Sequence, residues 1–254
     1  MASWPDLEQE LGRWAGLGRT ASLWWRDDDA VRPGPKLRRL IDLSKSSRIA
    51  LALAVIPGQA EDALGKVLAE LPEARMLVHG LHHENHAPDS EKKAEFGAHR
   101  PVHEMLGDTA IAWENLTARF PDQAMPVFVP PWNRIADDLV ARLPLARLRG
   151  LSRFGPRAAA QPAAGLLECN CHLDLIDWRG GRGFIGEDQA LDILIAHLQG
   201  RRMGSVDGAE SSGVLSHHDV MDRNSWDFLA ELLARTQECD GAHWLTMNEV
   251  FRLP

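Results

Sequence analysis

The stretch Val78-His79-Gly80-Leu81-His82-His83-Glu84-Asn85-His86 places four imidazoles within eight residues, directly after an apolar run typical of a β-strand. His79 and His83 are four residues apart, so a helical or turn conformation projects both to the same side. Neutral imidazole is the commonest protein ligand for zinc and similar divalent metals. The stretch therefore predicts a metal site, with a solvated histidine-rich loop as the alternative.

A second unusual stretch, Asp27-Asp28-Asp29, also follows an apolar run, Ala21 to Trp25. Three adjacent carboxylates repel one another, and burying them is costly without a cation or hydrogen-bond donors. The alternative is that one aspartate caps the following helix while the others face water. Together the two stretches offer two imidazole nitrogens and a carboxylate oxygen, which is the open ligand set of a hydrolytic metal site.

Apolar runs alternate with amphipathic segments along the chain. Residues 49–56 contain no polar side chain, as expected for a strand that is buried on both faces. The alternation of strands and helices favours a parallel sheet or barrel. The predicted strands are 21–25, 49–56, 74–78, 126–129, 151–154, 169–178 and 213–218. The predicted helices lie within 4–16, 36–44 or a little beyond, 60–70, 103–120, 135–148 with an interruption at Pro144, 187–200 and 225–235.

Chemically active side chains follow several of the predicted strands. Pro131 and Trp132 form a stiff turn after one strand, and His217 comes at the end of another. In the strand 169–178, the apolar residues Cys171, Leu173 and Leu175 alternate with polar ones, which predicts that these three share a face. In parallel α/β barrels, working residues gather at the carboxyl ends of strands. We therefore expect these strand ends to form one site.

The composition bounds the function. The 254 residues are 44% hydrophobic and 25% charged, which is ordinary for a globular protein, and the net charge of -8 argues against a nucleic-acid partner. No apolar run approaches the roughly 18 residues of a membrane span. Residues 1–6 lack the basic and apolar parts of a secretory signal. Three cysteines without a C-x-x-C pair suit a reducing compartment, so we expect a cytoplasmic protein without a membrane partner.

The order of these motifs resembles the polysaccharide deacetylase family (carbohydrate esterase family 4) over about residues 22–250. Asp28-Asp29 is similar to the paired aspartates of its first motif, and His79 and His83 match its H-x-x-x-H motif. Its remaining three motifs are approximated by Val129-Pro130-Pro131-Trp132, Asp174-Leu175-Ile176-Asp177-Trp178 and Leu215-Ser216-His217. The resemblance implies a distorted (β/α)7-8 barrel in residues 21–254, preceded by an N-terminal helix in residues 1–20, together forming a single domain.

The resemblance also implies a mechanism. Asp29, His79 and His83 would bind one divalent metal, zinc by preference, with cobalt or nickel as possible replacements. Asp28 would be the general base that activates water, and the Trp132 backbone N–H would help to hold the oxyanion. His217 would protonate the leaving amine, with Asp177 or Asp174 setting its tautomer. The remaining candidate substrate and oxyanion contacts are Pro131, Trp178 and Arg134.

Three features depart from the family pattern. The aspartate register is ambiguous, because Asp27 and Asp28 could equally be the base and ligand pair. Val129 stands where the third motif has an arginine, so another cation, Arg26 or Arg134, would have to orient the base. Three further imidazoles duplicate the expected ones, so the pair His82/His86 and the single His218 are fallback assignments.

The function that these features favour is a metal-dependent amide hydrolase. It would remove an acetyl group from a small-molecule or oligosaccharide substrate, an N-acetylated sugar or a related N-acyl compound. The alternative is a carbohydrate- or metabolite-binding protein that keeps the fold but has lost turnover, which the missing arginine supports. A purely structural metal site is a third possibility, but such sites are usually closed and cysteine-rich. The sequence indicates neither the acyl group nor the oligomeric state.

Overall fold

The strands form from the apolar runs of the sequence. In the computed structural model, which describes residues 1–253, the first four strands are β1 (Ala21–Ala30), β2 (Leu51–Val55), β3 (Arg75–Val78) and β4 (Ala124–Phe128). Every residue of β2 is buried, as predicted for a strand covered on both faces. β1 does not end at Trp25 but continues through the three aspartates, because β2 and β8 (Ser212–Ser216) pair with it on either side.

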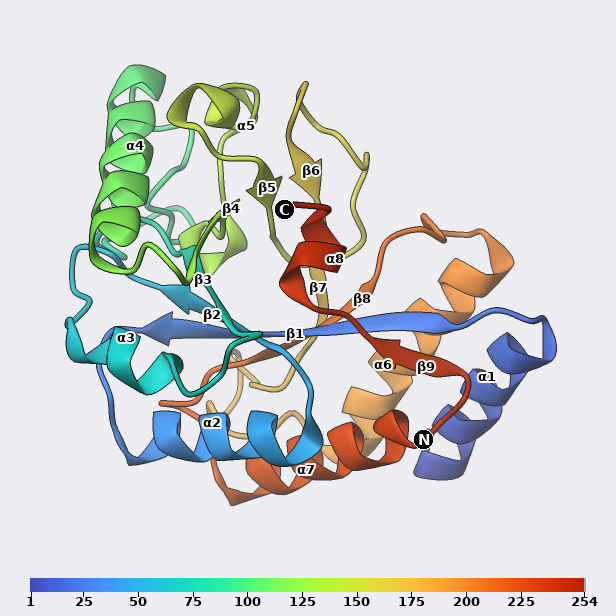
Figure 1. Cartoon of the computed structure of the whole chain (residues 1–254). Helices are drawn as coiled ribbons and strands as arrows, with labels where there is room; N and C mark the ends of the chain where they lie inside the picture. The colour runs from blue at the N-terminus through green and yellow to red at the C-terminus, as the bar shows by residue number, and fades with distance from the viewer. Residues whose placement is uncertain (254) are drawn as a thin grey trace.

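The sheet is parallel and curled. Its strand order is β6-β5-β4-β3-β2-β1-β8-β7, and β9 (Ala242–Trp244) pairs with β1. The ends of the sheet are brought together where Cys171, in β7 (Cys171–Asp174), bridges Phe154, which follows β5 (Gly150–Leu151). The remaining strand is β6 (Leu167–Glu168). This partly closed arrangement confirms the predicted distorted (β/α)7-8 barrel (Figure 1).

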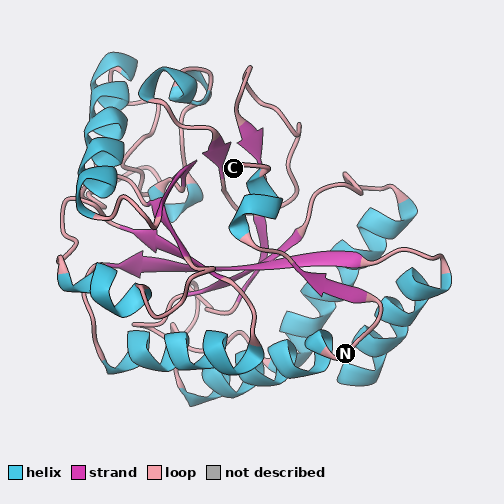
Figure 2. Cartoon of the chain, viewed as in Figure 1, coloured by secondary structure: helices cyan, strands magenta, loops and turns pink. Residues whose placement is uncertain are grey.

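Helices cover the outer face of the sheet. α2 and α7 lie side by side along β1, and α1 packs against α6 (Figure 1). The short α8 lies on the side of β1 opposite to α2 and α7 (Figure 2). There Phe251 meets Trp24 edge to face. The bounds are α1 Trp4–Gly16, α2 Pro35–Ser47, α3 Ala63–Leu68, α4 Val102–Arg119, α5 Asp137–Val140, α6 Glu187–Met203, α7 Arg223–Gln237 and α8 Met247–Phe251.

The sheet separates two apolar cores. The outer core lies beneath the helices and includes Leu23, Trp25 and Leu173. The inner core lies within the curl of the sheet and includes Trp24 and Cys171. Along β1 the side chains alternate between the two cores, as a regular strand requires. The prediction that Cys171 and Leu173 share a face is wrong, because these residues lie in different cores.

Several predicted segments are shorter in the structure. Residues 135–148 contain only α5 and the 3-10 turn η2 (Leu143–Ala146), because Pro144 has no N–H for a continuous helix. The predicted helix 60–70 shortens to α3, and the predicted strand 151–154 shortens to β5. Among residues 1–253, no helix is both long and apolar enough to cross a membrane.

Candidate active site

Asp29, His79 and His83 meet at the carboxyl ends of β1 and β3. The Nε2 atoms of His79 and His83 lie 3.1 and 3.3 Å from Oδ1 of Asp29. Ligands bound to one tetrahedral zinc at 2.0–2.1 Å would be about 3.3 Å apart. All three potential ligand atoms lie within 4.8 Å of one another, so the spacing fits one shared divalent ion.

The hydrogen bonding of His79 and the pKa of His83 also fit a metal. Nδ1 of His79 donates a hydrogen bond to the Val129 carbonyl at 2.9 Å, which directs Nε2 at Asp29. Burial lowers the pKa of His79, but the charges of Asp28 and Asp29 outweigh it and raise that pKa, so a bound metal would take the place of the proton on Nε2. Burial, together with the charge of His79, lowers the pKa of His83, which favours a neutral ligand there. Burial acts to raise the pKa of Asp29, but the hydrogen bond and charge of His79 outweigh it and hold that pKa below its ordinary value.

The histidine loop is held by a buried carboxylate, that of Glu95. It accepts hydrogen bonds from the backbone N–H groups of Leu81, His82 and His83 at 2.9–3.2 Å. Gly80 has a φ of +64°, and a Cβ there would lie 2.2 Å from Glu95 Oε2. The sequence placed Glu95 only in the segment after the histidines, because nothing in its spacing shows that it folds back beneath them.

Asp28 faces the inside of the barrel and is paired with Arg26. The guanidinium donates from Nε and Nη2 to the two carboxylate oxygens at 2.8 and 3.0 Å, and both side chains are buried. Arg26 also donates to Ser152 Oγ at 2.6 Å and to Asn133 Oδ1 at 2.9 Å. Of the two candidate cations, Arg26 therefore contacts Asp28.

The turn after β4 presents a free backbone donor. Trp132 and Asn133 both have left-handed backbone angles, with φ values of 55° and 56°. Pro131 fills the space below Gly80, and the Trp132 ring packs against His83 with centroids 4.3 Å apart. Within residues 1–253, the Trp132 N–H has no protein acceptor. This donor can therefore bind an oxygen atom of a ligand beside the metal cluster.

His217 follows β8 and lies beside Asp174. Its Nδ1 is 3.8 Å from Asp174 Oδ1, and its ring meets the edge of Trp178 at 4.8 Å. Trp178 is 41% exposed and donates from Nε1 to Asp174 Oδ2 at 2.8 Å. The charge of His217 is one of the smaller influences that lower the pKa of Asp29. Burial raises the pKa of Asp174.

Asp177 has a different environment from Asp174. Its carboxylate accepts from the backbone N–H groups of Arg179 and Gly180 and so closes the glycine-rich turn. No hydrogen bond or ion pair joins it to His217 in the part of the chain that the structure describes. Of the two aspartates considered for orienting His217, the structure thus places Asp174 beside it.

Asp27 points away from Asp28, toward the outer face. It accepts hydrogen bonds from Ser216 Oγ at 2.6 Å and from the His218 backbone N–H at 3.0 Å, and it pairs with His218 Nδ1. Burial lowers the pKa of His218, but the charge of Asp27 outweighs that and raises it. The Asp27–His218 pair therefore lies behind the site rather than in it.

The other fallback residues lie outside the cluster. His82 and His86 are exposed, and neither belongs to the Asp29 group. Arg134 donates to the Lys93 carbonyl at 2.6 Å, so its guanidinium is engaged with the loop before α4 rather than with Asp28.

Comparisons with known proteins bear on the fold. No protein-family model and no curated protein matches the chain. Among solved structures, it is similar to a candidate polysaccharide deacetylase from Mycobacterium smegmatis, with a TM-score of 0.62 and 14% identity over 99% of this chain and 92% of that one.

Two further solved structures are similar over most of their length. One is a variant of a peptidoglycan deacetylase from Bacillus subtilis, with a TM-score of 0.54 and 14% identity over 92% of this chain and 91% of that one. The other is a family 4 acetyl xylan esterase from Clostridium thermocellum in complex with a cobalt ion, with a TM-score of 0.52 and 13% identity over 91% of each chain. The chain therefore has the fold of the polysaccharide deacetylases.

Proposed function

We propose that the protein is a divergent polysaccharide deacetylase, a metal-dependent hydrolase that removes an acetyl group from an N-acetylated sugar or a related small N-acyl compound. The observation that carries the proposal is the meeting of Asp29, His79 and His83 within 4.8 Å, at the same barrel edge as a base, a free N–H and an acid. The shared fold supports it.

Asp29, His79 and His83 would hold the metal, and a set of three protein ligands would leave a coordination position for water or substrate. Two imidazoles and a carboxylate favour zinc, although cobalt and nickel accept the same ligands. A divalent ion at this position supplies Lewis-acid chemistry, because it lowers the pKa of water and polarises a carbonyl oxygen.

Asp28 is the proposed general base, and Arg26 orients it. The two-point contact with the guanidinium fixes the plane of the carboxylate and favours its ionised form, which can accept a proton from the attacking water. Arg26 thus supplies the cation that the third motif lacks at Val129. For this reason we favour an active enzyme over a binding protein that has lost turnover.

The Trp132 N–H is the proposed oxyanion donor. The left-handed turn at Trp132 and Asn133 keeps this N–H free of protein acceptors, so no protein hydrogen bond must break when charge develops on the substrate oxygen. Arg26 contacts Asn133 as well as Asp28 and therefore ties the turn to the base.

His217 is the proposed general acid for the leaving amine. Asp174 Oδ1 lies 3.8 Å from its Nδ1, beyond hydrogen-bond distance, and a small approach of the two side chains would orient the ring so that Nε2 carries and donates the proton. Trp178 packs against the ring and holds Asp174 through its indole N–H. The exposed face of Trp178 is available to contact a sugar ring.

The experiment that tests this proposal combines metal analysis with amine release. Purified protein is expected to contain about one zinc, cobalt or nickel ion per chain and to release amine from N-acetylated oligosaccharides. His83→Ala should lose both properties, whereas His86→Ala, which changes an exposed imidazole of the same loop, should keep both. Activity that persists in His83→Ala after its metal is lost would refute the mechanism.

A further inference from the structure

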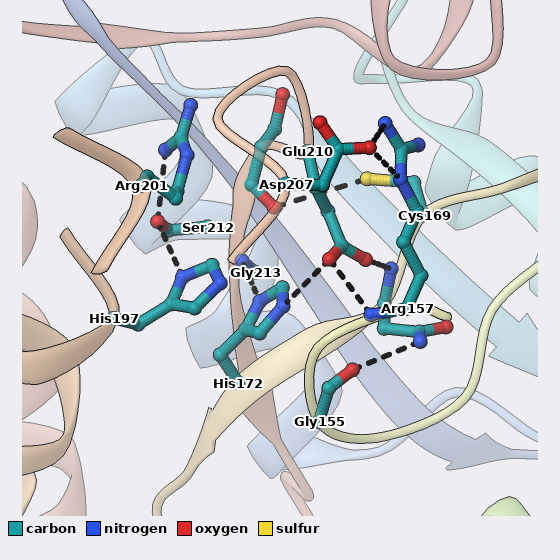
Figure 3. A network of polar contacts seen from close by, with 12 residues as sticks. Gly155, Arg157, Cys169, His172, His197, Arg201, Asp207, Glu210, Ser212 and Gly213 are labelled. Atoms are coloured by element: carbon teal, nitrogen blue, oxygen red, sulfur yellow. Dashed lines mark hydrogen bonds and ion pairs between the residues drawn. The ribbon is translucent and has the colours of Figure 1, made fainter. Parts of the chain in front are cut away.

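A second group of ligand-type side chains lies apart from the proposed site. His172, His197 and Glu210 are buried, and their potential ligand atoms lie within 4.8 Å of one another (Figure 3). The Nε2 atoms of both histidines have no hydrogen-bond partner among the described residues. By composition alone, this group resembles a second metal site.

Two features of the group argue against a metal. The backbone N–H of Gly213 donates to His172 Nδ1 at 3.1 Å, so the neutral ring carries its proton on Nε2, which faces Glu210 Oε2 at 3.4 Å. The His172 and His197 rings are stacked, with centroids 3.5 Å apart and planes at 16° (Figure 3). Lone pairs lie in the ring planes, so those of two stacked rings do not converge on one ion.

His172 instead lies at an irregularity in the pairing of β7 with β8. Cys171 pairs with Gly213, and Leu173 pairs with Val214. A step of two residues along β7 therefore matches a step of one residue along β8. His172 is thus the extra residue of a β-bulge, a feature that is rare between parallel strands. Its Nδ1 accepts the Gly213 N–H that faces β7 at this point.

The bulge changes which side chains face the inside of the barrel. Cys171 lies in the inner core, whereas Leu173 lies in the outer core. Asp174, three residues after Cys171, returns to the inner side, because it pairs in register with Leu215, which lies in the inner core. A regular strand would place Asp174 on the outer side, because residues three apart alternate in direction.

We propose that His172 is a positioning residue for the reaction, because its imidazole stabilises the bulge that turns Asp174 into the barrel beside His217. The inference rests on the proposed function, since the orientation of Asp174 matters to catalysis only if His217 donates a proton there. Glu210 faces the Nε2–H of His172, and the Gly213 N–H bonds to its Nδ1, so polar groups on both ring nitrogens fix the orientation of the imidazole.

The structure around Glu210 and Gly213 supports this role. Glu210 accepts from the backbone N–H groups of Asn170 and Arg157 at 3.0 and 2.9 Å, so its carboxylate is fixed (Figure 3). A Cβ on Gly213 would lie 2.8 Å from the Cα of Cys171. Only glycine therefore lets β8 approach β7 closely enough for the imidazole to accept its N–H.

Matched substitutions at His172 and His197 test the inference. His172→Asn keeps an acceptor, Oδ1, near the position of Nδ1, whereas His172→Leu removes it. We expect His172→Leu to lower kcat on an N-acetylated oligosaccharide roughly ten-fold or more, with KM within about three-fold of wild type. His172→Asn should recover most of the loss. His197→Leu, which removes the stacking partner but not the acceptor, should keep kcat near the wild-type value.

Structural measurements separate this inference from the proposed function. A crystal structure of His172→Leu should show Asp174 turned away from the Trp178 indole N–H. If the hydrogen bond between Asp174 and Trp178 is still present in that structure, the inference is overturned, whether or not the wild type is active. If His172→Leu does not fold, nitrogen NMR of the wild type decides: a proton on His172 Nε2 supports the inference, and a proton on Nδ1 overturns it.

Discussion

Arg26 and Asp28 form a two-point ion pair between side chains two residues apart on the same face of β1, at 2.8 and 3.0 Å. Both side chains are buried, so the pair is poorly screened by water. Because Arg26 also reaches Asn133 and Ser152, a single guanidinium connects Asp28, the proposed base, to the turn after β4 and to the chain after β5.

Replacing Arg26 should damage both stability and activity. In Arg26→Met, Asp28 becomes a buried carboxylate without its partner, which should lower the free energy of unfolding by about 3–5 kcal/mol. Urea denaturation measures this change. Arg134→Met removes a guanidinium whose one hydrogen bond among residues 1–253 is to the Lys93 carbonyl, so its cost should stay below about 1 kcal/mol. Equal losses in the two variants would contradict the role of Arg26.

Two aspartates four residues apart should differ in their effect on turnover. Asp174→Asn weakens the partner of His217 and should lower kcat by about 10²-fold, in the range of a general-acid contribution. Asp177→Asn changes a side chain that closes a turn and should alter kcat by only a few-fold. Steady-state kinetics on one N-acetylated substrate compares them, and the reverse order would return the orienting role to Asp177.

Glu95 should affect metal binding without being a ligand. Glu95→Gln replaces a carboxylate that accepts three backbone N–H groups of the histidine loop, so His83 should be held less firmly. We expect metal affinity to fall about 10–100-fold, as for other residues that orient ligands. Competition with a chelator measures this affinity. Glu91→Gln, an exposed change in the same segment, is the control and should bind metal as the wild type does.

His197 should make the fold sensitive to acid. Burial lowers the pKa of His197 to about 2. In the unfolded chain its pKa is near 6.5, so below that pH the unfolded state binds a proton that the folded state does not. Stability is therefore lost as the pH falls from about 6.5 toward 2, and the residue has no such effect above pH 7.

The size of this effect follows from linkage. Between pH 6.5 and 5, His197 should cost the wild type about 2 kcal/mol of unfolding free energy. Urea denaturation of wild type and His197→Gln at pH 7 and pH 5 measures the difference. The variant should lose less stability on acidification, and an equal loss in both proteins would show that His197 is not the sensitive group.

The barrel could be predicted from the sequence because its signals are local. The apolar run 49–56 and the alternation with amphipathic segments predict buried parallel strands, and β1 to β4 lie where these runs occur. Segments with weak signals were predicted less well. The interruption of residues 135–148 at Pro144 was expected, but the structure shortens the helical parts further, to α5 and the 3-10 turn η2.

The spacing of the residues predicted the chemistry of the site, but it did not predict which partner each of the three aspartates faces. The sequence left open which two of Asp27, Asp28 and Asp29 act. In the structure, Asp28 faces Arg26, Asp27 faces His218, and Asp29, with a φ of 71°, turns toward the histidines. Successive side chains of a β-strand point to opposite faces, whatever their chemistry. Which aspartate faces the inside of the barrel therefore depends on where β1 bends.

The sequence by itself determined the residue types of the candidate site and the strand ends that carry them, because ligand spacing and apolar periodicity are properties of neighbouring residues. The tertiary structure alone decided that Arg26 pairs with Asp28, that Glu95 folds beneath the histidines, and that β7 has a bulge at His172 before Asp174. These relationships join residues through strand register and loop closure, and neither is encoded in local spacing.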